Sequence, residues 1–159
     1  MEKVTSNRSF NGVHEVWSHD SIATSCKMTF SIYVPDNPNG DKQKTLIWLS
    51  GLTCTEENFR VKSGVQRFAS EHNMIVVSPD TSPRGEDVPD DPNYDFAQGA
   101  GFYLDATEEP WSKNFRMYSY VVDELTQLIK DYFPVDSNRL GISGHSMGCL
   151  LYTSDAADE

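Results

Sequence analysis

The sequence predicts an α/β fold, in which helices cover a sheet that contains parallel strands. Short apolar runs at residues 45–49 and 74–78 flank an amphipathic stretch at 63–73, which is the pattern of a β-α-β unit. Apolar residues then recur at intervals of three and four from 115 to 133, which predicts a long helix. A last short strand at 139–143 runs directly into a glycine-rich turn.

Composition indicates one domain that acts on a small molecule. The chain has 159 residues and a net charge of −11, which repels nucleic acid and anionic membrane surfaces. It has no apolar run of 18 residues and no charged-then-apolar leader, so we expect a cytoplasmic protein. Three cysteines without a C-x-x-C pair indicate reduced thiols, and the four histidines lack metal-ligand spacing. We therefore expect no metal site.

The remaining elements follow from local patterns. Residues 27–34 alternate strictly between apolar and polar, which predicts a half-buried antiparallel strand near an edge of the sheet. The turn-rich stretch 35–41 connects it to the strand at 45–49. Residues 79–112 are rich in proline and show little periodicity, and a loop of this length is usually functional. Its acidic run at 86–95 is expected to be a solvated face.

The motif Gly144-His145-Ser146-Met147-Gly148 fits G-x-S-x-G directly after a predicted strand. This is the context of a nucleophile elbow, a sharp strand-to-helix turn that lifts the serine hydroxyl above the sheet. Ser146 is therefore the candidate nucleophile. A simple glycine turn is the alternative, because the pentapeptide alone is weakly specific. His145 precedes the serine and its ring should point away from the hydroxyl, so we do not expect it to be the general base.

An oxyanion hole is predicted from two backbone N–H groups. In folds with such an elbow, one donor follows the nucleophile and the other lies in the loop after the third strand, which here gives Met147 and Leu52. The alternative for this loop is that Gly51 only permits a tight turn. Cys54 lies two residues past Leu52. Its thiol is expected either to lie next to the site or to be a small buried hydrophobic group. The other histidines, His14, His19 and His72, are expected at the surface or in packing.

Long motifs in the chain resemble the S-formylglutathione hydrolases, also called esterase D. The similarity runs from about Phe10 to Gly148. It is carried by WLSGLTCTEENF at 48–59, KSG at 62–64, SPDTSPRG at 78–85, GAGFYLDATEEPW at 99–111, MYSYVVDEL at 117–125 and GHSMG at 144–148.

The resemblance implies the N-terminal part of an α/β-hydrolase fold, with a mixed, mostly parallel sheet and flanking helices. It also implies a serine thioesterase that cleaves S-formylglutathione to glutathione and formate in formaldehyde detoxification, without a cofactor. By matching positions, Ser146 is the nucleophile, Leu52 and Met147 are the oxyanion donors, and 99–111 forms part of the site wall. Family members are often homodimers.

The end of the chain departs from the family. In this fold the acid and the histidine of the triad follow the serine, but no histidine follows Ser146. Residues 149–159, CLLYTSDAADE, resemble the translation of a sequencing adaptor, so we expect residues 1–148 to be the native part and 149–159 a non-native tail. The alternatives to the thioesterase are a general carboxylesterase or acyltransferase of the same fold, and a non-catalytic truncated fragment.

Overall fold

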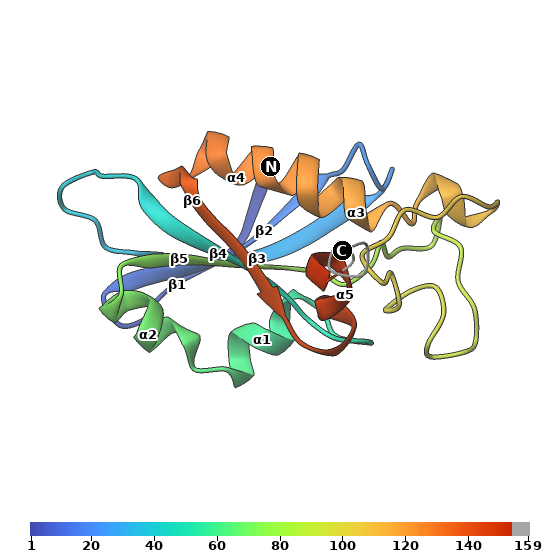
Figure 1. Ribbon diagram of the computed structural model, residues 1–159, viewed down its shortest axis with the longest axis horizontal. Helices are drawn as coiled ribbons and strands as arrows, with labels where there is room; N and C mark the ends of the chain where they lie inside the picture. Colours follow the sequence, from blue (N-terminus) through green and yellow to red (C-terminus); the bar gives the residue numbers. More distant parts are fainter. Residues whose placement is uncertain (154–159) are drawn as a thin grey trace.

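A six-stranded sheet forms the centre of the protein in the computed structural model, which describes residues 1–153 (Figure 1). The strand order is β1-β2-β3-β5-β4-β6. The strands are β1 (Glu2–Arg8), β2 (Gly12–Asp20), β3 (Lys27–Pro35), β4 (Gln43–Leu49), β5 (Met74–Pro79) and β6 (Val135–Gly144). The predicted α/β fold is confirmed, and so are the strands expected around 45–49, 74–78 and 139–143.

The sheet is mixed, as expected, but its parallel part is smaller than predicted. β4 pairs in parallel with β5 and with β6, which confirms the β-α-β unit. The pairs β1–β2, β2–β3 and β3–β5 are antiparallel. Antiparallel pairings therefore outnumber parallel ones among residues 1–153, because the first three strands form a meander joined by short turns.

The strand β3 is antiparallel as predicted, but it lies inside the sheet instead of near its edge. β2 pairs along its whole length, from Gly12 opposite Pro35 to Asp20 opposite Lys27. The strands β1 and β2 were not predicted from the sequence. They displace β3 from the edge, and β1 takes that position with all of its residues exposed. The polar side of β3 is covered too, since Ser31 is buried and its hydroxyl donates to the Glu56 carbonyl at 3.2 Å.

The helix predicted at 63–73 is confirmed as a short helix, and a second short helix that was not predicted precedes it. α1 (Glu56–Lys62) begins after Thr55, whose hydroxyl accepts from the Glu57 N–H. α2 (Val65–Glu71) follows Gly64, which has a φ of 65°. This left-handed glycine breaks the helix between the two segments, because few other residues adopt that conformation without strain.

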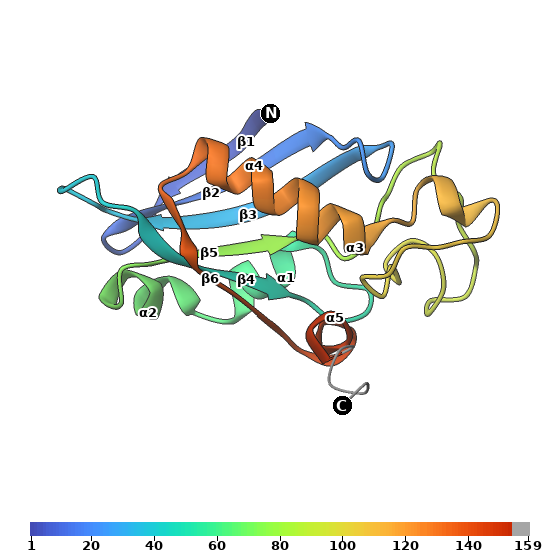
Figure 2. The ribbon, with the colours of Figure 1, turned by 45° about the horizontal axis from the view of Figure 1, so that its top comes forward.

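The helix predicted at 115–133 is present, with an irregular middle. α3 (Met117–Ser119) continues into a π-helical segment, η2 (Tyr120–Leu125), and then into α4 (Thr126–Tyr132). The Thr126 hydroxyl donates to the Val121 carbonyl at 2.8 Å inside the wide turn. Figure 2 shows this continuous helix lying across one face of the sheet.

The helices form a layer on each face of the sheet (Figures 1 and 2). On one face, the helix 117–132 packs Val121, Leu125 and Ile129 against buried residues of β3, β4 and β5. On the other face, Ala69 of α2 packs against Tyr33 and Val76, with Phe59 of α1 beside them. Among the described residues, no helix is long and apolar enough to cross a membrane.

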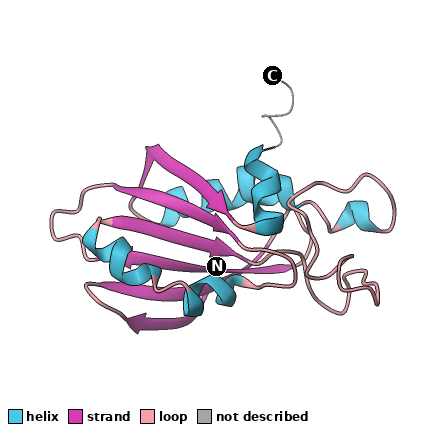
Figure 3. Ribbon diagram, turned by 60° about the horizontal axis from the view of Figure 1, so that its bottom comes forward, coloured by secondary structure: helices cyan, strands magenta, loops and turns pink. Residues whose placement is uncertain are grey.

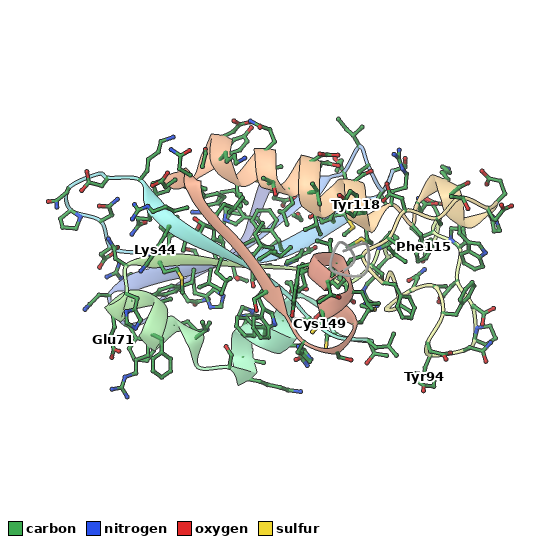
Figure 4. The ribbon with its side chains drawn as sticks, viewed as in Figure 1. Lys44, Glu71, Tyr94, Phe115, Tyr118 and Cys149 are labelled. Carbon is green, nitrogen blue, oxygen red and sulfur yellow. The ribbon has the colours of Figure 1, made fainter. Side chains whose placement is uncertain are left out.

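The carboxyl ends of β4, β5 and β6 converge at the end of the sheet that carries the long loops. Figure 3 shows the loops gathered there, and Figure 4 places Tyr94 and Phe115 at this end, with Lys44 and Glu71 at the opposite one. In open α/β sheets this end is where ligand sites are built. The elbow motif follows β6 at the same end of the sheet.

Candidate functional site

The turn after β6 has the backbone of a nucleophile elbow. β6 ends at Gly144, and Ser146 begins the short 3₁₀ turn η3 (Ser146–Gly148), which leads into α5 (Cys149–Thr153). Ser146 has a φ of 53° and its side chain is exposed. A left-handed conformation is costly for a non-glycine residue and clusters at functional sites. The strained strand-to-helix turn predicted from the sequence is therefore present.

Both glycines of the motif are required by close backbone contact with β4. A Cβ atom on Gly144 would lie 2.4 Å from the Leu49 carbonyl oxygen, and one on Gly148 would lie 2.1 Å from it. The His145 N–H also donates to this oxygen at 3.2 Å. The elbow therefore lies directly on the end of the neighbouring strand, where a side chain at either glycine position would collide with the backbone.

The loop after β4 lies against the elbow, as the oxyanion prediction requires. A Cβ atom on Gly51 would be 3.1 Å from the Cβ of Ser146, so the two segments touch although they are distant in sequence. The next residue, Leu52, precedes Thr53, which has a φ of 64°. Within residues 1–153, neither the Leu52 N–H nor the Met147 N–H donates a hydrogen bond. The two predicted donors are therefore unengaged beside Ser146.

His145 lies against an aromatic stack. Its ring is stacked on Trp48 at a centroid distance of 6.0 Å, and Trp48 is stacked on Phe59 at 4.3 Å. This packing holds the imidazole on the α1 side of the elbow. That His145 does not act as the base for Ser146 stays a prediction.

The other histidines belong to distant parts of the fold. His14 and His19 lie on β2, which is separated from β6 by β3, β5 and β4. At about 4.8 Å per strand, this is roughly 19 Å from the elbow. His72 ends α2 near the amino end of β5. No histidine of the described chain other than His145 lies near Ser146.

Cys54 has a half-buried thiol and a carbonyl that two side chains hold in place. The Thr81 hydroxyl and the Arg84 guanidinium both donate to the Cys54 carbonyl oxygen. The sequence placed Cys54 next to the site, and the structure places it at the end of the loop that touches Ser146. Whether its thiol affects the site stays a prediction.

A charge pair between the buried Asp80 and the half-buried Arg84 lies behind this loop, and the sequence analysis did not single it out. The Arg84 Nε donates to both carboxylate oxygens of Asp80, at 3.1 and 3.0 Å. Burial raises the pKa of Asp80, while the Arg84 charge and its hydrogen bonds oppose that shift. Burial also raises the pKa of Glu56, and the neighbouring Asp80 charge adds to the effect. The only available sequence signal was the spacing of Asp80 and Arg84 inside the SPDTSPRG motif.

The long loop predicted at 79–112 contacts the site and contains a pocket. The Thr53 N–H donates to the Gly99 carbonyl at 2.9 Å, and Ala100 and Gly101 then line a cavity of about 370 Å³. Its walls are mainly apolar and carry no Lys, Arg or His. Phe96, Trp111 and Phe115 pack edge to face along it. The cavity therefore suits an apolar or aromatic group close to the oxyanion loop.

Among residues 1–153, no group of three or more His, Cys, Asp or Glu side chains is arranged to hold a metal ion. Of the predicted tail, residues 149–153 form α5, which follows the elbow in Figure 4 at Cys149. Residues 154–159 lie outside the described part of the chain. The non-native origin of 149–159 therefore stays a prediction.

Comparison with known proteins identifies relatives along almost the whole chain. The esterase family model, described as "Putative esterase", matches residues 21–151. The chain is 53% identical to the S-formylglutathione hydrolase of Mus musculus over 149 residues, which cover 93% of this chain and 53% of that protein. It is 52% identical to the enzyme of the same name from Paracoccus denitrificans, over 92% of this chain and 53% of that protein.

A solved structure has nearly the same fold. The S-formylglutathione hydrolase from Agrobacterium tumefaciens superposes with a TM-score of 0.95 and 46% sequence identity, and the match covers 100% of this chain and 58% of that one. The chain spans about half the length of the curated relatives it matches.

Proposed function

Because the chain belongs to the esterase family, we propose that it is the N-terminal part of a serine thioesterase that hydrolyses S-formylglutathione. Two kinds of support bear on the substrate. The relatives at 52–53% identity carry that name, and so does the structure at a TM-score of 0.95. The substrate and the catalytic roles below are part of this proposal, since the chain spans about half of those proteins.

The proposed reaction is acyl transfer through Ser146. Its hydroxyl oxygen attacks the thioester carbonyl carbon, a base removes the hydroxyl proton, and the carbonyl oxygen becomes an oxyanion. The unengaged N–H groups of Leu52 and Met147 stabilise this charge. Collapse breaks the C–S bond and releases the glutathione thiolate, which takes up a proton. Water then hydrolyses the formyl ester, releasing formate and restoring the serine.

One observation carries the proposal: Ser146, in a left-handed conformation on the end of β6, lies against Gly51 of the loop after β4. A glycine turn without a catalytic role would not need a strained serine beside two unengaged N–H donors. The base and its acidic partner are proposed to lie in the part of the longer protein that follows Gly148, in the chain order Ser-acid-His.

The test uses the full-length protein encoded at the parent locus. Sequencing past the codon for Gly148 should reveal further strands and a downstream Asp and His. The purified protein should hydrolyse S-formylglutathione, and Ser146→Ala should lower kcat at least about 10³-fold. Wild-type protein without activity on this thioester, or a Ser146→Ala variant with full activity, would contradict the proposal.

A general carboxylesterase is the second candidate, and the pocket beside the oxyanion loop favours it. Its wall has four aromatic side chains and no cation to bind the carboxylates of glutathione. Comparing kcat/KM for S-formylglutathione with that for 4-nitrophenyl acetate separates the two candidates. A clear preference for the aryl ester would support the general esterase. An acyltransferase would instead require an acceptor other than water.

The 159-residue chain alone is proposed to be inactive. It offers no histidine after Ser146, and serine is a weak nucleophile without a base. Its turnover of either ester should equal that of its own Ser146→Ala variant. For the full-length protein we also propose a cytoplasmic location and possible homodimers, without nucleic-acid or membrane partners.

A further inference from the structure

The loop that touches Ser146 is anchored on both sides of Leu52 by one other segment of the chain. Four hydrogen bonds join residues 50–54 to residues 81–103. They are Tyr103 Oη to the Ser50 carbonyl at 2.9 Å, the Thr53 N–H to the Gly99 carbonyl at 2.9 Å, and two bonds to the Cys54 carbonyl, from the Thr81 hydroxyl and from Arg84 Nη2 at 3.1 Å.

Arg84 is the charged member of this set, and its own orientation is constrained. Its Nε donates to both carboxylate oxygens of Asp80, whose side chain is only 10% exposed. The Thr81 N–H holds the same carboxylate at 2.6 Å. A planar guanidinium held in this way directs Nη2 at the Cys54 carbonyl. Charge-assisted bonds of this kind are roughly twice as strong as neutral ones.

The anchored loop needs such support because it is strained. Thr53 lies between Leu52 and Cys54 with a φ of 64°. A left-handed conformation is unfavourable for a non-glycine residue and persists only where its surroundings over-determine it. The Leu52 N–H belongs to the peptide whose Gly51 carbonyl accepts from the Cys54 N–H at 3.2 Å, so a change in the position of Cys54 is passed directly to that peptide.

We propose that Arg84 is a positioning residue for the oxyanion hole: by holding the Cys54 carbonyl, it keeps the Leu52 N–H directed at the carbonyl group under attack by Ser146. The proposal rests on the proposed function, which makes Leu52 a donor. It predicts an effect of Arg84 on the transition state rather than on substrate binding, because the oxyanion develops only after attack.

A second arginine supplies a matched control. The Arg139 Nε donates to Asp136 at 2.6 Å, and its Nη2 donates to the Lys42 carbonyl at 3.2 Å. This Asp-Arg-carbonyl arrangement is similar but more exposed, with Nε bonded to one carboxylate oxygen. It lies at the amino end of β4, away from the elbow. Replacing either arginine by lysine keeps the charge and removes the planar fork.

The experiment compares Arg84→Lys and Arg139→Lys in the full-length protein. We expect Arg84→Lys to lower kcat about 10- to 100-fold with KM unchanged, which is less than the roughly 10²–10³-fold cost of losing a donor outright. Amide hydrogen exchange at residues 51–54 should become faster in the same variant. Arg139→Lys should leave kcat and exchange at 51–54 at wild-type values.

Several outcomes would overturn the inference: unchanged kcat and exchange in Arg84→Lys, an equal loss of kcat in both variants, or a loss expressed in KM alone. If Arg84→Lys does not fold, Thr81→Val removes the second donor to the same carbonyl without changing charge. Thr81→Val should then show the lower kcat and the faster amide exchange at 51–54. Wild-type values of both quantities in this variant would contradict the proposed role of the bonds to the Cys54 carbonyl.

Failure of the proposed function gives a different result. If wild-type protein does not act on S-formylglutathione, kcat of the two arginine variants is compared with 4-nitrophenyl acetate as the substrate. The expected results for Arg84→Lys and Arg139→Lys stay the same. The exchange measurement needs no substrate. If amide exchange at 51–54 is the same in Arg84→Lys and wild type while the protein hydrolyses the thioester, the role of Arg84 is rejected and the proposed thioesterase function is retained.

Discussion

Gly148 lies so close to Leu49 that a Cβ atom on the glycine would be 2.1 Å from the carbonyl oxygen of the leucine. The same atom would also lie 2.7 Å from the Leu49 carbonyl carbon. Both obstacles are backbone atoms of the fully buried end of β4, which cannot move aside as a flexible side chain can. The elbow and β4 therefore form one rigid unit.

Gly148→Ala should force the elbow and β4 apart. Because the added methyl group overlaps backbone, we expect the free energy of unfolding of the full-length protein to fall by about 1–3 kcal/mol, with a loss of esterase activity. Urea denaturation measures the first effect. Gly141→Ala in β6 is the control, since a Cβ there meets nothing within 4 Å. Equal stability of both variants would contradict the close contact.

Glu124→Ala should loosen the loop between β2 and β3. The Glu124 carboxylate accepts from the Ser21 hydroxyl at 2.8 Å and from the N–H groups of Ile22 and Ala23 at 3.0 and 2.8 Å. Its loss leaves these donors unpaired, at a cost of about 1–3 kcal/mol. Hydrogen exchange at 21–24 and urea denaturation provide the measurements.

The exposed neighbour Asp123 serves as the control for this loop, because its side chain makes no hydrogen bond or ion pair within residues 1–153. Asp123→Ala should change the stability by less than about 0.5 kcal/mol. Equal effects at both positions would show that Glu124 does not hold the loop.

Mild acid should destabilise the protein through His14. Burial, with a smaller contribution from the Arg60 charge, lowers the pKa of His14 to about 4. Its pKa in the unfolded chain is about 6.5, so between these values the unfolded state binds the proton and the folded state does not. Stability is therefore retained above about pH 6.5 and lost as the pH falls toward 4.

The contribution of His14 is measured by urea denaturation at pH 7 and pH 5. His14→Gln should remove part of the difference between the two pH values, by less than about 2 kcal/mol, because solvent screens the half-buried ring. His72→Gln, at the exposed end of α2, should leave the difference intact. An unchanged pH dependence in His14→Gln would exclude this residue as its source.

The 159-residue chain should associate in solution. β6 forms an edge of the described sheet, and beside it lies an apolar cavity of about 280 Å³ lined by residues such as Ile47, Val121 and Leu140. Unpaired edges and open apolar surfaces promote aggregation. Light scattering and binding of a hydrophobic dye should both report it. A monomer with a sharp, reversible two-state melt would prove this expectation wrong.

The sequence predicted best those elements whose pattern depends on burial alone. The apolar runs at 45–49 and 74–78 and the helix at 115–133 are present, because buried strands and a long amphipathic helix each have a distinct periodicity. β1 and β2 escaped prediction, since β1 is fully exposed and has no apolar pattern. The Asn11-Gly12 pair at the start of β2 was the available hairpin signal.

The elbow was predictable for a different reason: its glycines and strained serine leave a short motif. The bond from Arg84 to Cys54 was not predictable, because it joins segments that only the fold brings together. An arginine four residues after an aspartate in a proline-rich loop looks like an ordinary solvated pair. Its role becomes visible only when the Cys54 carbonyl lies within reach at 3.1 Å.

The π-helical turn at 120–125 explains how the long helix keeps its contact with the sheet. The buried residues Met117, Val121, Leu125 and Ile129 of the whole helix follow one another at steps of four. At about 100° per residue, each such step in a regular α-helix overshoots a full turn by about 40°, or about 120° over three steps. The wider turn takes up part of this rotation. Deleting one residue between Val121 and Leu125 would remove about 100° of the 120°, so that a regular α-helix could then keep both halves facing the core.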